Sequence, residues 1–379
     1  MPFRIAIDAS RTTKTQPTGA ERYATRLIQA LIKANESRRE PFLFRLYFRD
    51  APSHALFAKS DYVQEVVIRF PRLWTHLRLA AALWRAKPGI TFVPAHTLPF
   101  LFPGAGIVTV HDLGYKHFPE AHRRMQRAYL DFTTRFSQRR AALLLADSQA
   151  TASDLSVIYG TPSDKIRIVY PGIDTESFRH SARNIDEARE RCQLPARYFI
   201  FIGTLQPRKN IERLVTAFGL WQREHDNGET ALVLAGAKGW LFQKSWIAGA
   251  KNVIVTGYID EARKGGLLAG AIALVFPSLY EGFGFPAVEA MHCGTPVIAS
   301  NTSSLPELVG DAGLLVDPTN VCAIAAAMGR CSEDESLRQR LIASGYKRAK
   351  RFTWEAAASS VIDVFDELAQ GAENGRASI

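Results

Sequence analysis

The sequence is poor in cysteine and has no long hydrophobic run. None of its few cysteines lies in CxxC or zinc-finger spacing, so we expect free thiols rather than disulfides or a metal site; they are Cys192, Cys293, Cys322 and Cys331. No uninterrupted apolar stretch reaches the roughly 18 residues of a membrane span. The first residues show no basic region followed by a long apolar segment, which argues against a signal peptide. A cytoplasmic location is therefore expected.

Several ligand-binding motifs are absent as well. The polar loop at residues 10–19 follows an expected strand but lacks GxGxxG, and only Gly19 marks the start of the helix behind it. No DxD pair of the kind that holds a divalent metal occurs, so we expect no cofactor and no obligatory metal. RNA-recognition and helix-turn-helix signatures are missing too, which argues against nucleic acid as a partner.

Positive charge is unevenly distributed along the chain. The net charge is +10, and residues 1–180 contain 26 Lys and Arg against 15 Asp and Glu, whereas the remainder contains 21 against 22. The basic half fits an acidic partner such as anionic lipid, a phosphorylated acceptor or nucleic acid, the last without a supporting motif. The alternative is a solvated basic face that aids solubility.

The pattern of apolar runs predicts a doubled α/β protein. The 379 residues suggest two to three domains. Short apolar runs predict strands at residues 3–8, 41–48, 63–70, 90–94, 106–111, 142–146 and 166–170, and again at 198–203, 231–235, 253–256, 271–276, 296–300 and 314–316. Helical spacing predicts helices at 21–33, 120–140, 151–159, 211–221, 261–269, 286–292, 320–330, 334–349 and 353–369. Charged residues 175–195 form the expected linker, and 371–379 an expected frayed tail.

Residues 69–87 (RFPRLWTHLRLAAALWRAK) are basic, aromatic and amphipathic. On a regular helix one face would carry Leu73, Leu77, Ala80, Ala81 and Trp84. Such a helix could lie on a membrane surface, but packing of this face in the core is the favoured interpretation.

The stretch 274–300 (LVFPSLYEGFGFPAVEAMHCGTPVIAS) combines a strand, a glycine-bearing loop and a helix start. Glycines in Glu281-Gly282-Phe283-Gly284-Phe285 allow backbone N–H groups to approach a ligand. Pro286 favours the first turn of a helix. Unpaired N–H groups at a helix start favour an anion. Glu281 and Glu289 suit hydroxyl groups instead, because an ionised carboxylate only accepts hydrogen bonds. A nucleotide sugar has both features; the alternative is an ordinary loop with two solvated glutamates.

Three further sites follow other expected strands. Gly203 ends a strand, and Arg208 and Lys209 in the loop behind it can hold a diphosphate, although adjacent cations are more often a surface pair. His111 stands at the carboxyl end of a strand, where ligands of open α/β sheets bind, although a lone His is usually structural. Ser148 can cap a helix or contact a ligand.

Together these residues resemble a retaining glycosyltransferase of family 4 (glycosyl transferases group 1) with the GT-B fold. The resemblance covers nearly the whole chain, and Glu281 and Glu289 match the family's E-x7-E signature. Further matches are HDL (111–113), ADSQATASDL (146–155), IRIVYPGID (166–174), FIGTLQPRKNIERL (201–214), LVLAGAKGW (232–240) and VTGYID (255–260).

The resemblance implies two Rossmann-like domains facing across a cleft: residues 1–175 for the acceptor and 190–353 for the nucleotide sugar. The last helix, within residues 354–379, would cross back to the first domain. Glu289 would hold the ribose hydroxyls and Glu281 a sugar hydroxyl, while Arg208 and Lys209 neutralise the diphosphate. The remaining donor contacts would come from Gly19, Gly203, Gly282, Phe283, Gly284 and Phe285, and His111 would touch the transferred sugar.

One position departs from the family pattern. Many members carry a second phosphate-binding arginine where this chain has Thr204, so Arg208 and Lys209 are expected to carry the charge alone. The variant resembles mannosyltransferases of bacterial polysaccharide assembly, which favours GDP-mannose as donor and a saccharide or lipid-linked acceptor, with an anionic membrane surface as a further expected partner. Other enzymes of the same fold, such as an epimerase or a sugar-phosphate synthase, and a non-catalytic nucleotide-sugar binder are the alternatives.

Overall fold

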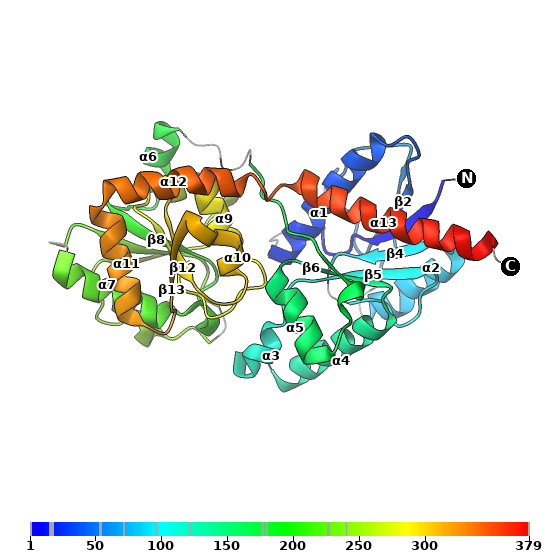
Figure 1. Cartoon of the computed structure of the whole chain (residues 1–379), viewed down its shortest axis with the longest axis horizontal. Helices are drawn as coiled ribbons and strands as arrows, with labels where there is room; N and C mark the ends of the chain where they lie inside the picture. The colour runs from blue at the N-terminus through cyan, green and yellow to red at the C-terminus, as the bar shows by residue number, and fades with distance from the viewer. Residues whose placement is uncertain are drawn as a thin grey trace. The chain divides into compact units, whose positions relative to one another are not determined.

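Two compact units make up the chain in this computed structural model (Figure 1). The first consists of Met1–Tyr115, His122–Gly172 and Thr353–Ile379, and the second of Lys116–Ala121 and Ile173–Phe352. The structure describes residues 2–14, 19–52, 55–70, 73–95, 97–121, 123–175, 178, 181–225, 228–239 and 241–377. Parts of the expected loop at 10–19 and of the expected linker at 175–195 therefore lie outside the described residues.

A seven-stranded parallel sheet forms the centre of the first unit. The strands are β1 (Arg4–Asp8), β2 (Leu43–Phe48), β3 (Val63–Val67), β4 (Ile90–Val93), β5 (Ala105–Val110), β6 (Leu143–Ala146) and β7 (Ile166–Ile168). Their order is β3-β2-β1-β4-β5-β6-β7, so the order reverses between β1 and β4. The helices are α1 (Gly19–Glu36), α2 (Ala80–Ala86), α4 (Arg124–Arg140), α5 (Gln149–Tyr159) and α13 (Trp354–Ala377), together with the short α3 (Gly114–His117).

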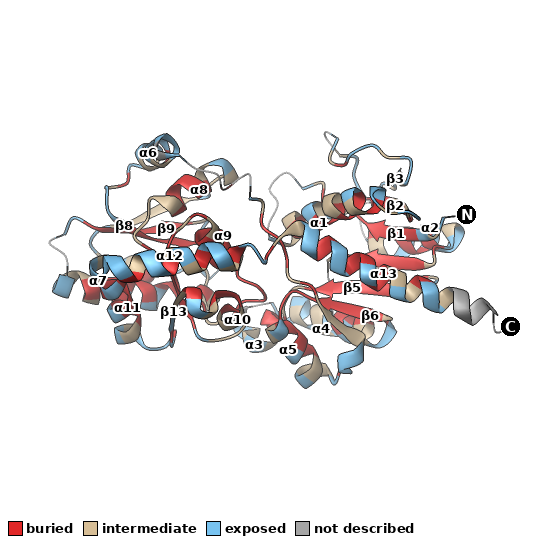
Figure 2. Ribbon diagram, turned by 45° about the horizontal axis from the view of Figure 1, so that its top comes forward, coloured by how far each residue is buried: buried red, intermediate tan, exposed pale blue. Residues whose placement is uncertain are grey.

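The second unit repeats this architecture with six parallel strands in the order β10-β9-β8-β11-β12-β13. The strands are β8 (Tyr198–Ile202), β9 (Ala231–Ala235), β10 (Val253–Gly257), β11 (Leu274–Phe276), β12 (Val297–Ser300) and β13 (Gly313–Val316). The helices are α6 (Ala182–Arg191), α7 (Ile211–His225), α8 (Glu261–Ala269), α9 (Phe285–His292), α10 (Leu305–Val309), α11 (Val321–Glu333) and α12 (Glu335–Ala349). Buried strands lie between exposed helical surfaces in each unit (Figure 2). The predicted doubly wound fold is confirmed.

The last helix, α13, returns to the first unit and packs against α1 (Figure 1). Its apolar face, including Val361 and Phe365, joins Leu27 and Leu31 of α1 in one buried cluster. Arg38 at the end of the α1 region binds Asp366 through two hydrogen bonds of 2.9 and 2.6 Å. The predicted return of the last helix is thus confirmed.

The expectation of a frayed tail at residues 371–379 is wrong for most of that segment. The helix continues to Ala377. Alanine and glutamate at 372 and 373 and arginine at 376 favour helix, and no proline interrupts the segment. Residues 378–379 lie outside the described part of the chain.

The expected packing of residues 69–87 is also corrected. Leu73, Leu77 and Trp84 are exposed, whereas Trp74, Leu79, Ala80 and Leu83 are buried. The reason is a π-helical turn, Thr75–Leu79, that precedes α2. A π-helical turn adds one residue to the helix and thereby rotates the residues on either side of it, so the apolar stripe of a regular helix is not the stripe that packs.

Phe365 supports a direct test of the docking of α13. It is fully buried, with its ring 5.7 Å from Phe92, 6.0 Å from Phe42 and 6.3 Å from Phe44 between centroids. We expect Phe365→Ala to lower the unfolding free energy of the first unit by about 3–5 kcal/mol in urea denaturation, because it leaves a cavity. Phe132→Ala, at an exposed phenylalanine of the same unit, should cost under about 1 kcal/mol. Equal losses would contradict the docking role.

Candidate functional site

The site lies at the carboxyl ends of two neighbouring strands of the second unit, β8 and β11. These strands pair with each other where the strand order of the sheet reverses. Such a switch point leaves a crevice outside the carboxyl ends of the strands, because the connections on its two sides run to opposite faces. The loop after β8 supplies Arg208 and Lys209, and the loop after β11 supplies Glu281. The topology therefore brings together residues that lie about seventy positions apart in sequence.

Both cations bind the one carboxylate. Arg208 Nη1 donates to Glu281 Oε2 at 3.1 Å, and Lys209 Nζ donates to Glu281 Oε1. Arg208 also donates to the carbonyl of Tyr280 at 2.8 Å, and its own carbonyl accepts from the N–H of Leu279 at 2.8 Å. Lys209 and Glu281 are buried, while Arg208 is partly exposed. The two loops are thus joined by side-chain and backbone contacts.

The electrostatics keep Glu281 ionised. Burial alone would raise the pKa of this carboxyl group, but the charges of Lys209 and Arg208 and the hydrogen bond from Lys209 outweigh it. The net result is a pKa below the ordinary value of 4.5. At neutral pH the cluster holds two cations and one anion, which leaves a net positive charge at the edge of the sheet.

Asn210 fixes the backbone beside this cluster. It adopts a left-handed conformation with φ +61° and ends the short 3-10 turn Pro207–Lys209. Its side-chain amide donates to the carbonyl of Pro277 at 3.0 Å and to that of Pro318 at 2.6 Å. Asparagine tolerates this conformation better than most residues, so one side chain both permits the turn and links it to the loop after β11.

The glycine loop behind Glu281 is built as the sequence suggests. Gly284 caps α9 with φ +120°, and a β-carbon there would lie 2.7 Å from Leu305 Cδ2. Gly203, at the end of β8, has φ +147°. Phe283 is buried and packs edge-on against Phe285 at 5.0 Å between centroids. Gly282 lies in the same loop, so all four predicted residues 282–285 precede or begin α9.

Serines on the following loop hold this segment in place. Ser303 Oγ accepts from the N–H of Glu281 at 3.0 Å, and Ser304 Oγ donates to the carbonyl of Glu281 at 3.0 Å and to that of Phe283. Ser304 is fully buried. These contacts fix the backbone on both sides of Gly282.

Glu289, on α9, forms a second buried ion pair that the sequence did not reveal. Its partner is Lys264 of α8, whose Nζ binds Glu289 Oε2 and lies 5.5 Å from the centroid of the Phe178 ring. Both side chains are buried. No local pattern points to this pair: Gly266, two residues after Lys264, packs closely against Asn184 and Ala188 of α6 and not against α9.

The other predicted residues lie in the first unit. His111 follows β5, and its Nδ1 donates to Asp147 Oδ2 at 2.7 Å; a carboxylate can only accept, which places the proton on Nδ1. Burial would lower the pKa of His111, but Asp147 more than compensates and raises it. The Tyr23 ring packs edge-on against His111 at 4.7 Å between centroids. Gly19 begins α1, and a β-carbon there would meet only open space.

The neighbouring residues Asp147 and Ser148 have different structural roles. Ser148 is the N-cap of α5 and accepts from the N–H of Thr151 at 3.1 Å, which confirms the capping interpretation. Asp147, one residue earlier, orients His111. Among the described residues, no group of three His, Cys, Asp or Glu side chains is placed to hold a metal ion.

Family models match both halves of the chain. Residues 17–177 match the model described as "Glycosyltransferase Family 4", and residues 183–348 the model described as "Glycosyl transferases group 1". The chain is 31% identical to the O-antigen chain mannosyltransferase B of Escherichia coli, over 96% of this chain and 99% of the relative.

Solved structures show the same fold. Sucrose-phosphate synthase from Thermosynechococcus elongatus superimposes with a TM-score of 0.76 at 22% identity, covering 97% of this chain and all of that one. Anabaena HepE, crystallised with UDP and glucose, superimposes with a TM-score of 0.70 at 19% identity, covering 96% of this chain and all of that one.

The buried cluster predicts a pH-dependent stability effect of Glu281→Gln. The ionised carboxylate stabilises the folded second unit above its ordinary pKa of 4.5, and this contribution is lost as the pH falls through the lower folded pKa. At pH 7 we expect the variant to lose about 3 kcal/mol of unfolding free energy, because Lys209 keeps its charge without its buried partner. The difference from the parent should shrink below pH 4.5.

Urea denaturation across this pH range measures the effect. Glu229→Gln is the matched control, because Glu229 is an exposed glutamate of the same unit. A Glu281→Gln protein as stable as its parent at pH 7 would show that the cluster contributes no net stability.

Proposed function

This chain belongs to glycosyltransferase family 4, the retaining transferases with the GT-B fold, and we propose that it transfers mannose from GDP-mannose to a growing polysaccharide. The acceptor is a saccharide or lipid-linked saccharide of the O-antigen or lipopolysaccharide class. Two findings support this proposal: the full-length similarity to an O-antigen chain mannosyltransferase, and the cationic cluster at the switch point of the second unit.

The Arg208–Lys209–Glu281 cluster is the single observation that carries the chemistry. Arg208 binds a diphosphate oxygen as a planar fork, and Lys209 supplies a point charge. Both stabilise the charge that develops on the leaving nucleoside diphosphate, and such stabilisation usually contributes more to catalysis than any other effect. Glu281 accepts a hydrogen bond from a hydroxyl of the sugar. Because two cations already hold its carboxylate, Glu281 positions the sugar and does not attack it.

Glu289 accepts from the ribose hydroxyls, and its ion pair with Lys264 holds the carboxylate in place. Backbone N–H groups of residues 282–285 line the sugar and phosphates at the start of α9, with Gly203 on the β8 side. His111 and Gly19 belong to the first unit, and their expected contacts with the donor stay predictions.

The reaction exchanges one bond at the sugar. The bond from C1 to the β-phosphate oxygen breaks, and a bond from C1 to the acceptor oxygen forms on the same face. The acceptor's proton passes to the departing phosphate, which leaves with the electron pair as GDP. The protein's part is to hold the donor, stabilise the leaving charge and exclude water.

We propose that the enzyme acts at the cytoplasmic surface of a membrane, where lipid-linked saccharides are presented. No helix among the described residues is both long enough and apolar enough to span a bilayer. The excess of Lys and Arg in residues 1–180 supports attraction to an anionic surface.

A donor screen tests the function. We expect GDP-mannose to raise the melting temperature more than UDP-, ADP- or dTDP-sugars, since only a bound ligand stabilises the folded state by mass action. The same donor should be consumed in the presence of a mannan-type acceptor, with GDP as product. Transfer to a free sugar phosphate would indicate a synthase instead, and donor binding without turnover would indicate a non-catalytic binder.

Lys209→Ala tests the charge stabilisation. We expect kcat to fall at least ~100-fold, equivalent to about 2.7 kcal/mol of transition-state stabilisation. Lys251→Ala is the control, because Lys251 is an exposed lysine of the same unit. Circular dichroism must show that both variants fold. An unchanged kcat would remove Lys209 from the mechanism.

A further inference from the structure

Helix α4 buries polar side chains and exposes apolar ones, the reverse of an ordinary amphipathic helix. Toward the core it places Thr133, Thr134 and Ser137, all buried. Away from the core it exposes Met125 by 86%, Phe132 by 57% and Tyr129 by 49%. An apolar spacing of four and three residues normally marks the face that packs inside. Here that spacing lies on the outer surface, so the helix leaves a largely exposed apolar stripe.

The exposed apolar area extends beyond α4. The ring of Phe100 lies 5.7 Å from Phe132, and His76 stacks on Phe100 at 3.8 Å between centroids. Two more exposed side chains adjoin these residues in sequence: Leu77 follows His76 in the π-helical turn, and Leu101 follows Phe100. We call the set Leu77, Leu101, Met125, Tyr129 and Phe132 the α4 face.

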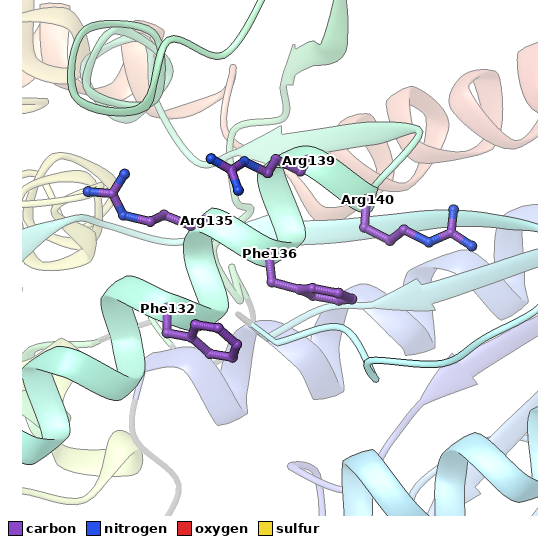
Figure 3. Close-up of a pocket in the computed structure, with 5 residues that line it drawn as sticks. All are labelled: Phe132, Arg135, Phe136, Arg139 and Arg140. Carbon is purple, nitrogen blue, oxygen red and sulfur yellow. The ribbon is translucent and has the colours of Figure 1, made fainter.

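Positive charge surrounds the α4 face. Helix α4 contains five arginines and a single acidic residue, Asp131, which already binds Arg135 at 3.1 Å. A cavity of about 280 Å³ opens on this helix, lined by Phe132, Arg135, Phe136, Arg139 and Arg140. Figure 3 shows both phenylalanine rings turned to one side of the helix and the Arg135 and Arg139 guanidinium groups to the other. The helix thus carries apolar side chains and cations on adjoining faces.

We propose that the α4 face docks on the surface of a bilayer containing anionic lipid. Aliphatic and aromatic side chains enter the boundary between headgroups and acyl chains, and the arginines bind lipid phosphates around them. The proposal builds on the proposed function, because a lipid-linked acceptor is presented at such a surface. It does not depend on which sugar is transferred.

Two other occupants fit the observations less well. A second copy of the chain, related by two-fold symmetry, would bring two sets of five arginines together, and like charges repel. A nucleic acid would use the arginines and aromatic rings, but it has no use for the exposed aliphatic chains of Leu77, Leu101 and Met125. Hydrocarbon and phosphate together match both components of the face.

Vesicle flotation tests the proposal. The parent protein should bind phosphatidylcholine vesicles that contain about 30% phosphatidylglycerol, should bind pure phosphatidylcholine far less, and should release as salt rises above roughly 0.1 M. Met125→Ser with Phe132→Ser removes the apolar anchors, and Arg124→Glu with Arg139→Glu reverses two exposed charges. We expect each pair to weaken the partition coefficient at least ~10-fold.

Matched controls and a second assay make the outcome decisive. Val157→Ser changes an exposed apolar residue elsewhere on the first unit, and Arg39→Glu an exposed arginine; both should bind vesicles like the parent. Consumption of GDP-mannose without vesicles should be the same in all these variants as in the parent. If the parent protein itself consumes no GDP-mannose, that result contradicts the proposed function and leaves the docking proposal standing. Three results would overturn the docking proposal. In the first, the parent protein fails to bind anionic vesicles, and in the second, neither pair of substitutions changes vesicle binding. In the third, the substitutions abolish dimerisation or oligonucleotide binding and leave vesicle binding unchanged.

Discussion

The pairing of one buried carboxylate with two cations is the interaction on which the site depends. Arg208 and Lys209 come from the loop after β8 and Glu281 from the loop after β11, and neither loop could present its charge alone at such low exposure. A buried cation without a counter-charge would lose its proton or destabilise the unit. Glu281 therefore allows Lys209 to stay charged while buried. A cation kept charged in a dry environment interacts with a phosphate more strongly than one in water.

The same device occurs a second time on α9. Glu289 and Lys264 form a buried pair between helices α9 and α8, much as Glu281 and Lys209 do between loops. In each case a lysine fixes a carboxylate that the sequence suggests for hydroxyl recognition. The proposed donor site would thus be rigid before any ligand arrives, because the acids are oriented by the protein itself. Such preorganisation lowers the entropic cost of binding.

Much of this could be predicted from the sequence, for physical reasons that particular residues illustrate. Parallel strands buried on both faces, such as Phe199–Phe201 within β8, appear as continuous apolar runs, which makes them easy to locate in the sequence. Gly284 and Pro286 indicate the start of α9 because glycine tolerates the positive φ of the cap and the fixed φ of proline suits the first helical turn. The contacts of Lys264 and Asp147 could not be predicted, because their partners are distant in sequence and the pattern along one segment does not identify a partner. The π-helical turn at Thr75–Leu79 could not be predicted either, because one added residue in a turn changes which face of the helix packs without changing the amino-acid composition of the segment.

Net charge and site charge prove to be separate properties of this chain. The proposed donor site in the second unit needs cations for a diphosphate, yet the half of the sequence that contains it is close to neutral. Its buried Lys209 and Lys264 each face a buried glutamate. The excess of positive charge, +11, resides instead in residues 1–180, which include the five arginines of α4. Because charge on exposed side chains is screened and solvated, it contributes little to stability. Exposed arginines instead attract a negatively charged partner over a long range. On α4 they lie beside exposed apolar side chains, which the hydrocarbon of the proposed bilayer would bury.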